Sequence, residues 1–115
     1  MRLLFRCDNI PYAWTADALE AEADRLIHTH WRQLCKGSRD QRTRARKRRK
    51  RTDLAMCVCL CLATARRMRK HGAPTFADLR EKDWARAKNE ADEMFRRIHD
   101  GDLKVEDLTT DTRSS

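Results

Sequence analysis

The segment Leu54-Ala-Met-Cys-Val-Cys-Leu-Cys-Leu-Ala63 is a run of ten apolar residues, and it decides the fold. A helix that is apolar on every side belongs in the interior of a protein. A strand is the alternative, because Cys57, Cys59 and Cys61 would then share one face. The Ala- and Arg-rich continuation is typical of a helix instead, and a lone strand would have no partner here. We therefore predict a buried central helix of about 18 residues.

Sequence signals bound this helix at its C-terminal end and leave its N-terminal end open. Four basic residues crowd the last turn: Arg66, Arg67, Arg69 and Lys70. Gly72 and Pro74 follow, and a basic last turn before Gly and Pro is a strong C-terminal stop. Upstream, nothing between Arg39 and Arg51 breaks a helix. That segment is therefore either a disordered loop or an N-terminal extension of the helix, formed when a partner neutralises its charge.

Two amphipathic helices flank the central one in the sequence. The first begins after Thr15, a predicted N-cap, and runs for about five turns to Gly37. Its apolar stripe consists of Leu19, Ala23, Leu26, Ile27, His30 and Leu34. The second has Thr75 as its cap and runs to Gly101, either unbroken or with a break near Lys82-Asp83. Its apolar stripe consists of Phe76, Leu79, Trp84, Ala87, Ala91, Met94, Phe95 and Ile98.

Length and composition agree with one small all-α domain. With three Gly and two Pro in 115 residues, the chain lacks the turns that a sandwich or barrel needs. We predict a small three-helix bundle, with a four-helix bundle as the alternative. It forms a single domain over residues 1–108, with the basic segment 39–51 inside it and a disordered tail at 109–115. Four apolar residues of the N-terminal lead are expected to dock on the core: Leu3, Leu4, Phe5 and Ile10.

The whole net charge of +8 resides in ten residues, Arg42–Arg51 (RTRARKRRKR). The other 105 residues carry 18 basic and 18 acidic side chains and are neutral as a set. Six Arg and two Lys suit bidentate phosphate contacts, and the absence of aromatic residues from the segment argues against base readout. The predicted polyanion-binding residues are Arg42, Arg44, Arg46, Lys47, Arg48, Arg49, Lys50 and Arg51. A solvated loop or a nuclear-import-like patch is the alternative.

Neither a metal site nor a catalytic group is indicated. The five cysteines are an odd number and three lie in one apolar run, so a disulfide framework is not expected and a reducing cytosol fits better. On a helix Cys57, Cys59 and Cys61 do not converge on a metal, and His28 and His30 lie on different sides. No nucleophile has a positioned base, so we expect no enzyme and no cofactor. The longest apolar stretch is well short of the roughly 20 residues that span a bilayer, and no membrane partner is expected.

Two parts of the chain carry a resemblance to a known family. The first is the opening of the central helix, Thr52-Asp-Leu-Ala-Met-Cys57. The second is the last helix and its exit, Trp84-Ala-Arg-Ala-Lys-Asn-Glu-Ala-Asp-Glu-Met-Phe-Arg-Arg-Ile98 followed by His99-Asp-Gly-Asp-Leu103. In order of elements the chain resembles the head–tail connector (adaptor) proteins of long-tailed bacteriophages and gene-transfer particles. About 80 residues are covered, including the first helix after Thr15.

The resemblance implies a virion protein that forms a homo-oligomeric ring beneath the portal and gives the tail proteins a platform. The resemblance implies that the protein is located in the host cytoplasm during assembly and then in the virion. The basic segments, repeated around the ring, would meet the portal or, non-specifically, the DNA. The alternating segment Asp102–Leu108 would lie as an extended tail on a neighbouring subunit through Leu103, Val105 and Leu108. Deletion of Leu103–Ser115 is then expected to leave the monomer folded and to stop ring assembly.

Two other functions fit the same basic segment. One is a small regulatory protein that binds RNA or DNA through Arg42–Arg51. The other is an inhibitor that docks this segment on an acidic host protein. A regulator should keep sequence-selective binding at raised salt, whereas a connector should show weak, non-selective binding that salt abolishes.

Overall fold

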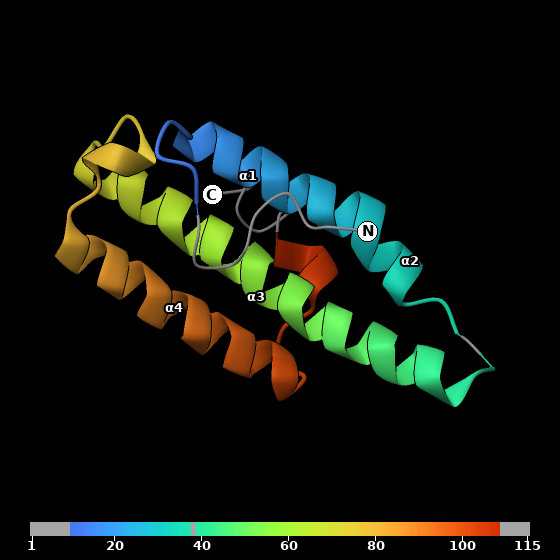
Figure 1. Ribbon diagram of the computed structural model, residues 1–115. Helices are drawn as coiled ribbons and strands as arrows, with labels where there is room; N and C mark the ends of the chain where they lie inside the picture. Colours follow the sequence, from blue (N-terminus) through green and yellow to red (C-terminus); the bar gives the residue numbers. More distant parts are fainter. Residues whose placement is uncertain (1–9, 38, 109–115) are drawn as a thin grey trace.

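The computed structural model describes residues 10–37 and 39–108, and within these ranges it is an all-α bundle, as predicted (Figure 1). Its longest helix, α3, lies in the middle and packs against α1 on one side and α4 on the other. The elements are α1 (Ala16–Arg25), the π-helical segment η1 (Leu26–Trp31), α2 (Arg32–Leu34), α3 (Gln41–His71), the 3-10 turn η2 (Phe76–Asp78), α4 (Glu81–His99) and the 3-10 turn η3 (Val105–Asp107).

The central apolar run is a buried helix, as its composition predicted. Every residue from 54 to 65 except Met56 is buried. α3 packs between α1 and α4, and these neighbours cover its apolar side chains. Cys57, Cys59 and Cys61 have no exposed surface and serve as small apolar side chains. Burial of each large aliphatic residue in this run contributes about 1.5–3 kcal/mol.

The predicted C-terminal stop of α3 is confirmed in detail. Gly72 adopts left-handed backbone angles, with φ of 67°. Its N–H donates to the Arg69 carbonyl at 3.4 Å, and the N–H of Ala73 donates to the Met68 carbonyl at 2.8 Å. These two bonds form a Schellman motif, which glycine favours because it has no Cβ to strain that conformation.

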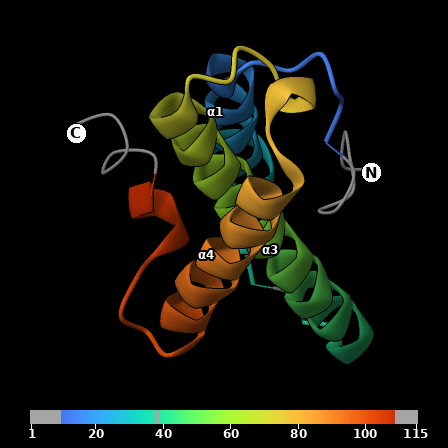
Figure 2. The ribbon, with the colours of Figure 1, turned by 90° about the vertical axis from the view of Figure 1, so that its left-hand side faces the viewer.

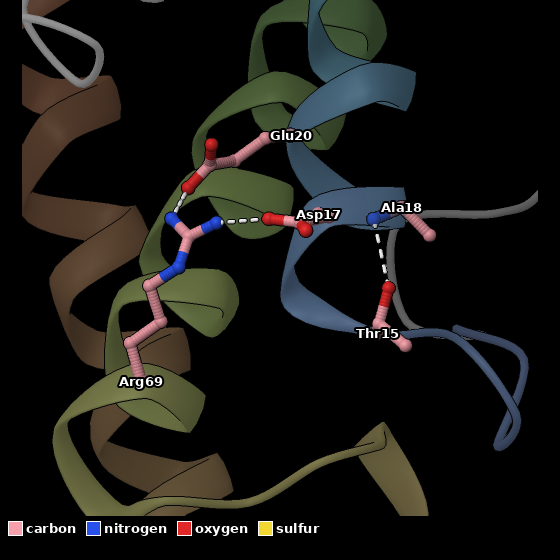
Figure 3. A network of polar contacts seen from close by, with 5 residues as sticks. All are labelled: Thr15, Asp17, Ala18, Glu20 and Arg69. Atoms are coloured by element: carbon pink, nitrogen blue, oxygen red, sulfur yellow. Dashed lines mark hydrogen bonds and ion pairs between the residues drawn. The ribbon is translucent and has the colours of Figure 1, made fainter.

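The N-terminal cap of α1 is also confirmed. The N–H of Ala18 donates to Thr15 Oγ1 at 3.1 Å. One turn further on, Arg69 of α3 bridges Asp17, at 2.5 Å, and Glu20 (Figure 3). These two ion pairs hold the start of α1 beside the end of α3. Because Asp17 is almost fully exposed, its ion pair contributes little to the stability of the fold and mainly aligns the two helices.

A buried polar cluster lies where α1 passes into η1. Arg25 donates through Nε to the buried Glu22 at 2.6 Å, and its Nη1 lies 3.1 Å from Nε2 of the buried His30. Burial, and secondly the positive charge of Arg25, lower the pKa of His30, while Glu22 acts in the opposite direction. His30 is therefore neutral at pH 7, with Nε2 accepting from Arg25.

His30 makes stability depend on pH. The unfolded chain takes up a proton at His30 near its ordinary pKa of 6.5, and the folded chain resists protonation to lower pH. The free energy of unfolding should therefore fall as the pH drops from 7 to 5, as measured by urea denaturation. His30→Gln, which keeps an acceptor for Arg25, should flatten this dependence. His28→Gln, at an exposed position of the same segment, is the control; equal curves for both variants would contradict the assignment to His30.

The two elements after α3 match the broken alternative of the prediction rather than an unbroken helix from Thr75. Thr75 does act as a cap, in a capping box with Asp78. The turn η2 ends at once, because Leu79 and Arg80 have extended backbone angles. The break lies at Leu79-Arg80, just before the predicted Lys82-Asp83, and α4 forms a separate amphipathic helix.

The prediction of an extended segment at residues 102–108 is wrong for Val105–Asp107. Val105 and Leu108 are 1% and 4% exposed in the core of the same chain, and Leu103 is half-buried against it. Trp31 Nε1 donates to Glu106 Oε1 at 3.0 Å and ties η3 to η1. The segment folds back because burying its aliphatic side chains is favourable within the chain itself.

This packing also bears on the predicted subunit interface. Val105 and Leu108 are covered by their own chain, so a ring needs other contact residues or an exchange of this segment between copies. Ile10 is buried, as expected of the N-terminal lead. Leu3, Leu4, Phe5 and the predicted disordered tail at 109–115 lie outside the described residues.

Candidate nucleic-acid interface

The predicted polyanion-binding segment forms the N-terminal part of α3. We call Arg42–Arg51 the basic arm. It is helical throughout, so α3 has 31 residues rather than the expected 18 or so. The arm is about 15 Å long, at 1.5 Å per residue, and projects beyond the last turn of α4 (Figure 1). In the view turned by 90°, this end of α3 diverges from α4, which leaves the arm uncovered by that helix (Figure 2).

Asp40 starts the arm as an N-cap. Its carboxylate accepts from the backbone N–H groups of Arg42 and Thr43, each at 3.3 Å, and from Thr43 Oγ1 at 2.8 Å. The Thr43 hydroxyl, followed by the Arg42 N–H, lowers the pKa of the Asp40 carboxyl. Asp40 is therefore ionised at neutral pH, when it also complements the positive end of the helix dipole.

Two of the eight cations hold the arm against the chain that precedes it. Arg51 Nη1 donates to the Leu34 carbonyl at 2.6 Å, and Lys47 Nζ donates to the Lys36 carbonyl at 3.2 Å. Both side chains are half-buried, as is Thr43 one turn earlier. Leu34 is the last residue of α2 and Lys36 follows two residues later, so these two cations donate to carbonyls at and just beyond a helix end.

The other six cations are exposed and make no ion pair with a carboxylate in residues 10–37 or 39–108. They are Arg42, Arg44, Arg46, Arg48, Arg49 and Lys50. Several pairs are three or four residues apart, where like charges on a helix repel by a few tenths of a kcal/mol each. A bound polyanion would relieve this repulsion. The arm is thus a helix whose exposed positive charges are not neutralised by ion pairs with the described carboxylates.

The arm is helical despite the repulsion among its cations. The Asp40 cap, the contacts of Lys47 and Arg51, and continuity with the buried part of α3 together offset the repulsion. The division into two structural and six exposed cations was not predicted. A signal was present, however: Lys47 and Arg51 continue at helical spacing the line of the buried residues Leu54 and Val58.

No other described part of the chain forms a comparable site. The pocket between the end of α3 and the start of α4, about 250 Å³, is lined by both charge signs, and His71 and Asp83 face each other there at 3.4 Å. No group of His, Cys, Asp or Glu within residues 10–37 and 39–108 could hold a metal ion. Cys35 is exposed, but partial desolvation of its thiol raises the pKa more than the nearby charge of Arg51 lowers it, so this thiol is not activated. None of the described helices has the length and apolar character needed to cross a membrane.

Comparisons with models of known protein families, with curated proteins and with solved structures found no match. The function of this chain must therefore be inferred from the basic arm itself.

Proposed function

We propose that this protein binds the phosphate backbone of nucleic acid through the basic arm. The observation that carries the proposal is the set of six exposed cations that form no ion pair with a described carboxylate, on a helix that Lys47 and Arg51 hold against the preceding chain. The rest of the chain is neutral as a set, so the arm dominates the attraction to any polyanion.

A phosphate backbone suits the arm better than an acidic protein surface does. Duplex DNA carries one negative charge per roughly 1.7 Å of axis, which amounts to about nine phosphates over the length of the arm. Five of the six exposed cations are Arg, whose planar guanidinium matches phosphate with two parallel hydrogen bonds. If the protein were instead an inhibitor of an acidic protein, the surface of that target would need a comparable density of carboxylates.

The salt dependence of binding tests the proposal. With six phosphate contacts, log K should fall with log salt at a slope of about −5. Arg46→Gln should make this slope shallower by about 1, because Arg46 is exposed. Arg51→Gln should leave the slope nearly unchanged and lower the free energy of unfolding by about 1–2 kcal/mol, because the Leu34 carbonyl loses its donor.

These outcomes separate binding cations from structural ones. The slope comes from fluorescence anisotropy titrations at several salt concentrations, and stability from urea denaturation. A wild-type slope near zero would reject nucleic-acid binding. Equal slope changes in both variants would show that Arg51 also contacts phosphate.

A connector ring is a second proposal, supported by the position of the arm at one end of an elongated molecule of 48 × 28 × 23 Å. Copies arranged side by side would carry their arms around one rim, where weak phosphate contacts reinforce one another. Quantitative mass spectrometry of purified particles from the source culture tests it. A ring-like ratio to the portal protein would support the connector, and absence from complete particles would reject it. A regulator would instead retain sequence-selective binding at raised salt.

A further inference from the structure

Two rows of cations flank an uncharged ridge on the exposed side of the basic arm. At 100° per residue, Arg42, Arg46, Arg49 and Lys50 form one row, here the long row. The short row, Arg44 and Arg48, lies about 165° around the helix from it. The ridge between the rows consists of Ala45 within the arm, Gln41 directly before it and Thr52 directly after it, all exposed. Arg48 borders this ridge, and the exposed Asp53 follows the arm on the line of the long row.

The ridge faces away from the rest of the protein. The inward line of the arm consists of Thr43, Lys47 and Arg51, all half-buried, and lies roughly opposite Ala45 around the helix. The arm continues the buried part of α3 without a break, so it cannot rotate to present another side; Lys47 and Arg51 also hold it through their bonds to backbone carbonyls. A binding partner of the arm therefore contacts the ridge, with one row of cations on each side of it.

From this arrangement we infer that the basic arm inserts into the major groove of B-form duplex DNA. The ridge then faces the base edges, and the two rows reach the phosphates of the two opposite walls. This inference rests on the proposed function and adds to it the class of nucleic acid and the groove.

The dimensions of the arm fit this groove. A helix with its side chains is about 10–12 Å across, and the major groove of B-DNA is about 12 Å wide. The arm spans about three turns and projects past α4, so it can enter without a clash with that helix. The major groove of A-form RNA is deep and too narrow for side-chain access, so duplex RNA should bind less tightly.

The residues of the arm also disfavour single strands. Non-specific binding of single strands relies on aromatic side chains that stack on the bases, and the arm has none. Trp31, on η1, is half-buried and donates to Glu106. Cations on both flanks of a straight helix match two walls of phosphates, whereas one flexible strand can follow only one row at a time.

The ridge permits close approach but little reading of sequence. Ala45 offers only a methyl group, and the Thr52 hydroxyl donates to the Arg48 carbonyl at 3.1 Å within the helix. Gln41 carries the only amide that could pair with a base edge. Affinity should therefore vary less than about tenfold among duplex sequences, since stronger discrimination requires bidentate base contacts.

Two double variants test whether both walls are contacted. Arg42→Gln with Arg46→Gln removes two cations of the long row, and Arg44→Gln with Arg48→Gln removes both cations of the short row at the same spacing. If the arm lies in the groove, each pair should make the salt slope for duplex DNA shallower by about 2. If either pair leaves duplex binding unchanged, only one side of the arm contacts phosphate and the inference is wrong.

A second experiment locates the groove. Dimethyl sulfate methylates guanine N7 in the major groove and adenine N3 in the minor groove. The intact protein should protect N7 on duplex DNA and leave N3 reactive. Ala45→Leu should weaken duplex binding about tenfold by lifting the ridge from the groove floor, whereas Ala85→Leu, at an exposed position of α4, should have no effect. Protection of N3 alone, or equal effects of the two substitutions, would overturn the inference.

The same titrations, repeated with single-stranded DNA and duplex RNA of the same sequence, separate the two levels of the proposal. Absence of salt-dependent binding to all three would reject the proposed function itself. Binding to single strands or duplex RNA as tight as binding to duplex DNA would leave the proposed function standing and reject only insertion into the major groove.

Discussion

Replacing Arg42, Arg46, Arg49 and Lys50 together with glutamine will weaken binding to duplex DNA roughly several-thousandfold at about 100 mM salt. Each lost phosphate contact removes close to one power of ten in affinity at that concentration, because the counterions it releases are no longer released. The four positions are exposed and form no ion pair with a described carboxylate, although the charge of Arg46 helps to lower the pKa of Asp40, so the bundle loses little. Stability should rise slightly, since like charges at positions 42, 46 and 50 no longer repel.

The control carries the same change in net charge at another place. Arg66, Lys70, Arg80 and Lys82 are exposed and lie near the opposite end of α3, and their replacement by glutamine should cost far less affinity. Anisotropy measures binding and thermal denaturation measures stability. Equal losses in both quadruple variants would show that net charge alone, rather than the basic arm, controls binding. A melting temperature well below that of the wild type would show that these cations support the fold.

Replacing Val105 and Leu108 together with alanine will lower the free energy of unfolding by about 3–6 kcal/mol. Both side chains are almost completely buried, and truncation removes their burial energy and leaves cavities beside the core. A loss of this size is a large part of the stability of a small domain. Urea denaturation followed by circular dichroism measures it.

Lys104→Ala with Asp107→Ala is the matched control, because these residues are exposed in the same segment. It should change stability by less than about 1 kcal/mol. For the same reason, the deletion of Leu103–Ser115, expected from the sequence to leave the monomer intact, should instead destabilise it. A truncated protein as stable as the full chain would show that η3 does not hold its place on the core.

Much of the fold could be predicted from local patterns. The apolar run at 54–63 required a buried helix, and the cap at Thr15 and the stop at Gly72 follow rules that involve only a few neighbouring residues. The basic arm was located by charge alone. Its helical state was left open, because its self-repulsion favours disorder and the compensating contacts come from another part of the chain.

The site itself was only partly visible in the sequence. All eight basic residues of the arm were predicted to bind a polyanion, yet two of them bind carbonyls of this chain. At the other end of the molecule, the alternation of residues 102–108 is equally typical of a tail on a neighbour and of a segment folded on its own core. The structure shows the second for Val105 and Leu108.

Periodicity, capping and net charge act over a few residues, so the helices, their ends and the position of the basic arm follow from the order of amino acids. The contacts that define the outward face of the arm and the path of the C-terminal segment join residues far apart in the chain. Arg51 and Leu34 are 17 positions apart, and Trp31 and Glu106 are 75 apart. Such contacts exist only after α1, α3 and α4 have packed together, because only packing brings these groups within hydrogen-bonding distance and removes their competing water.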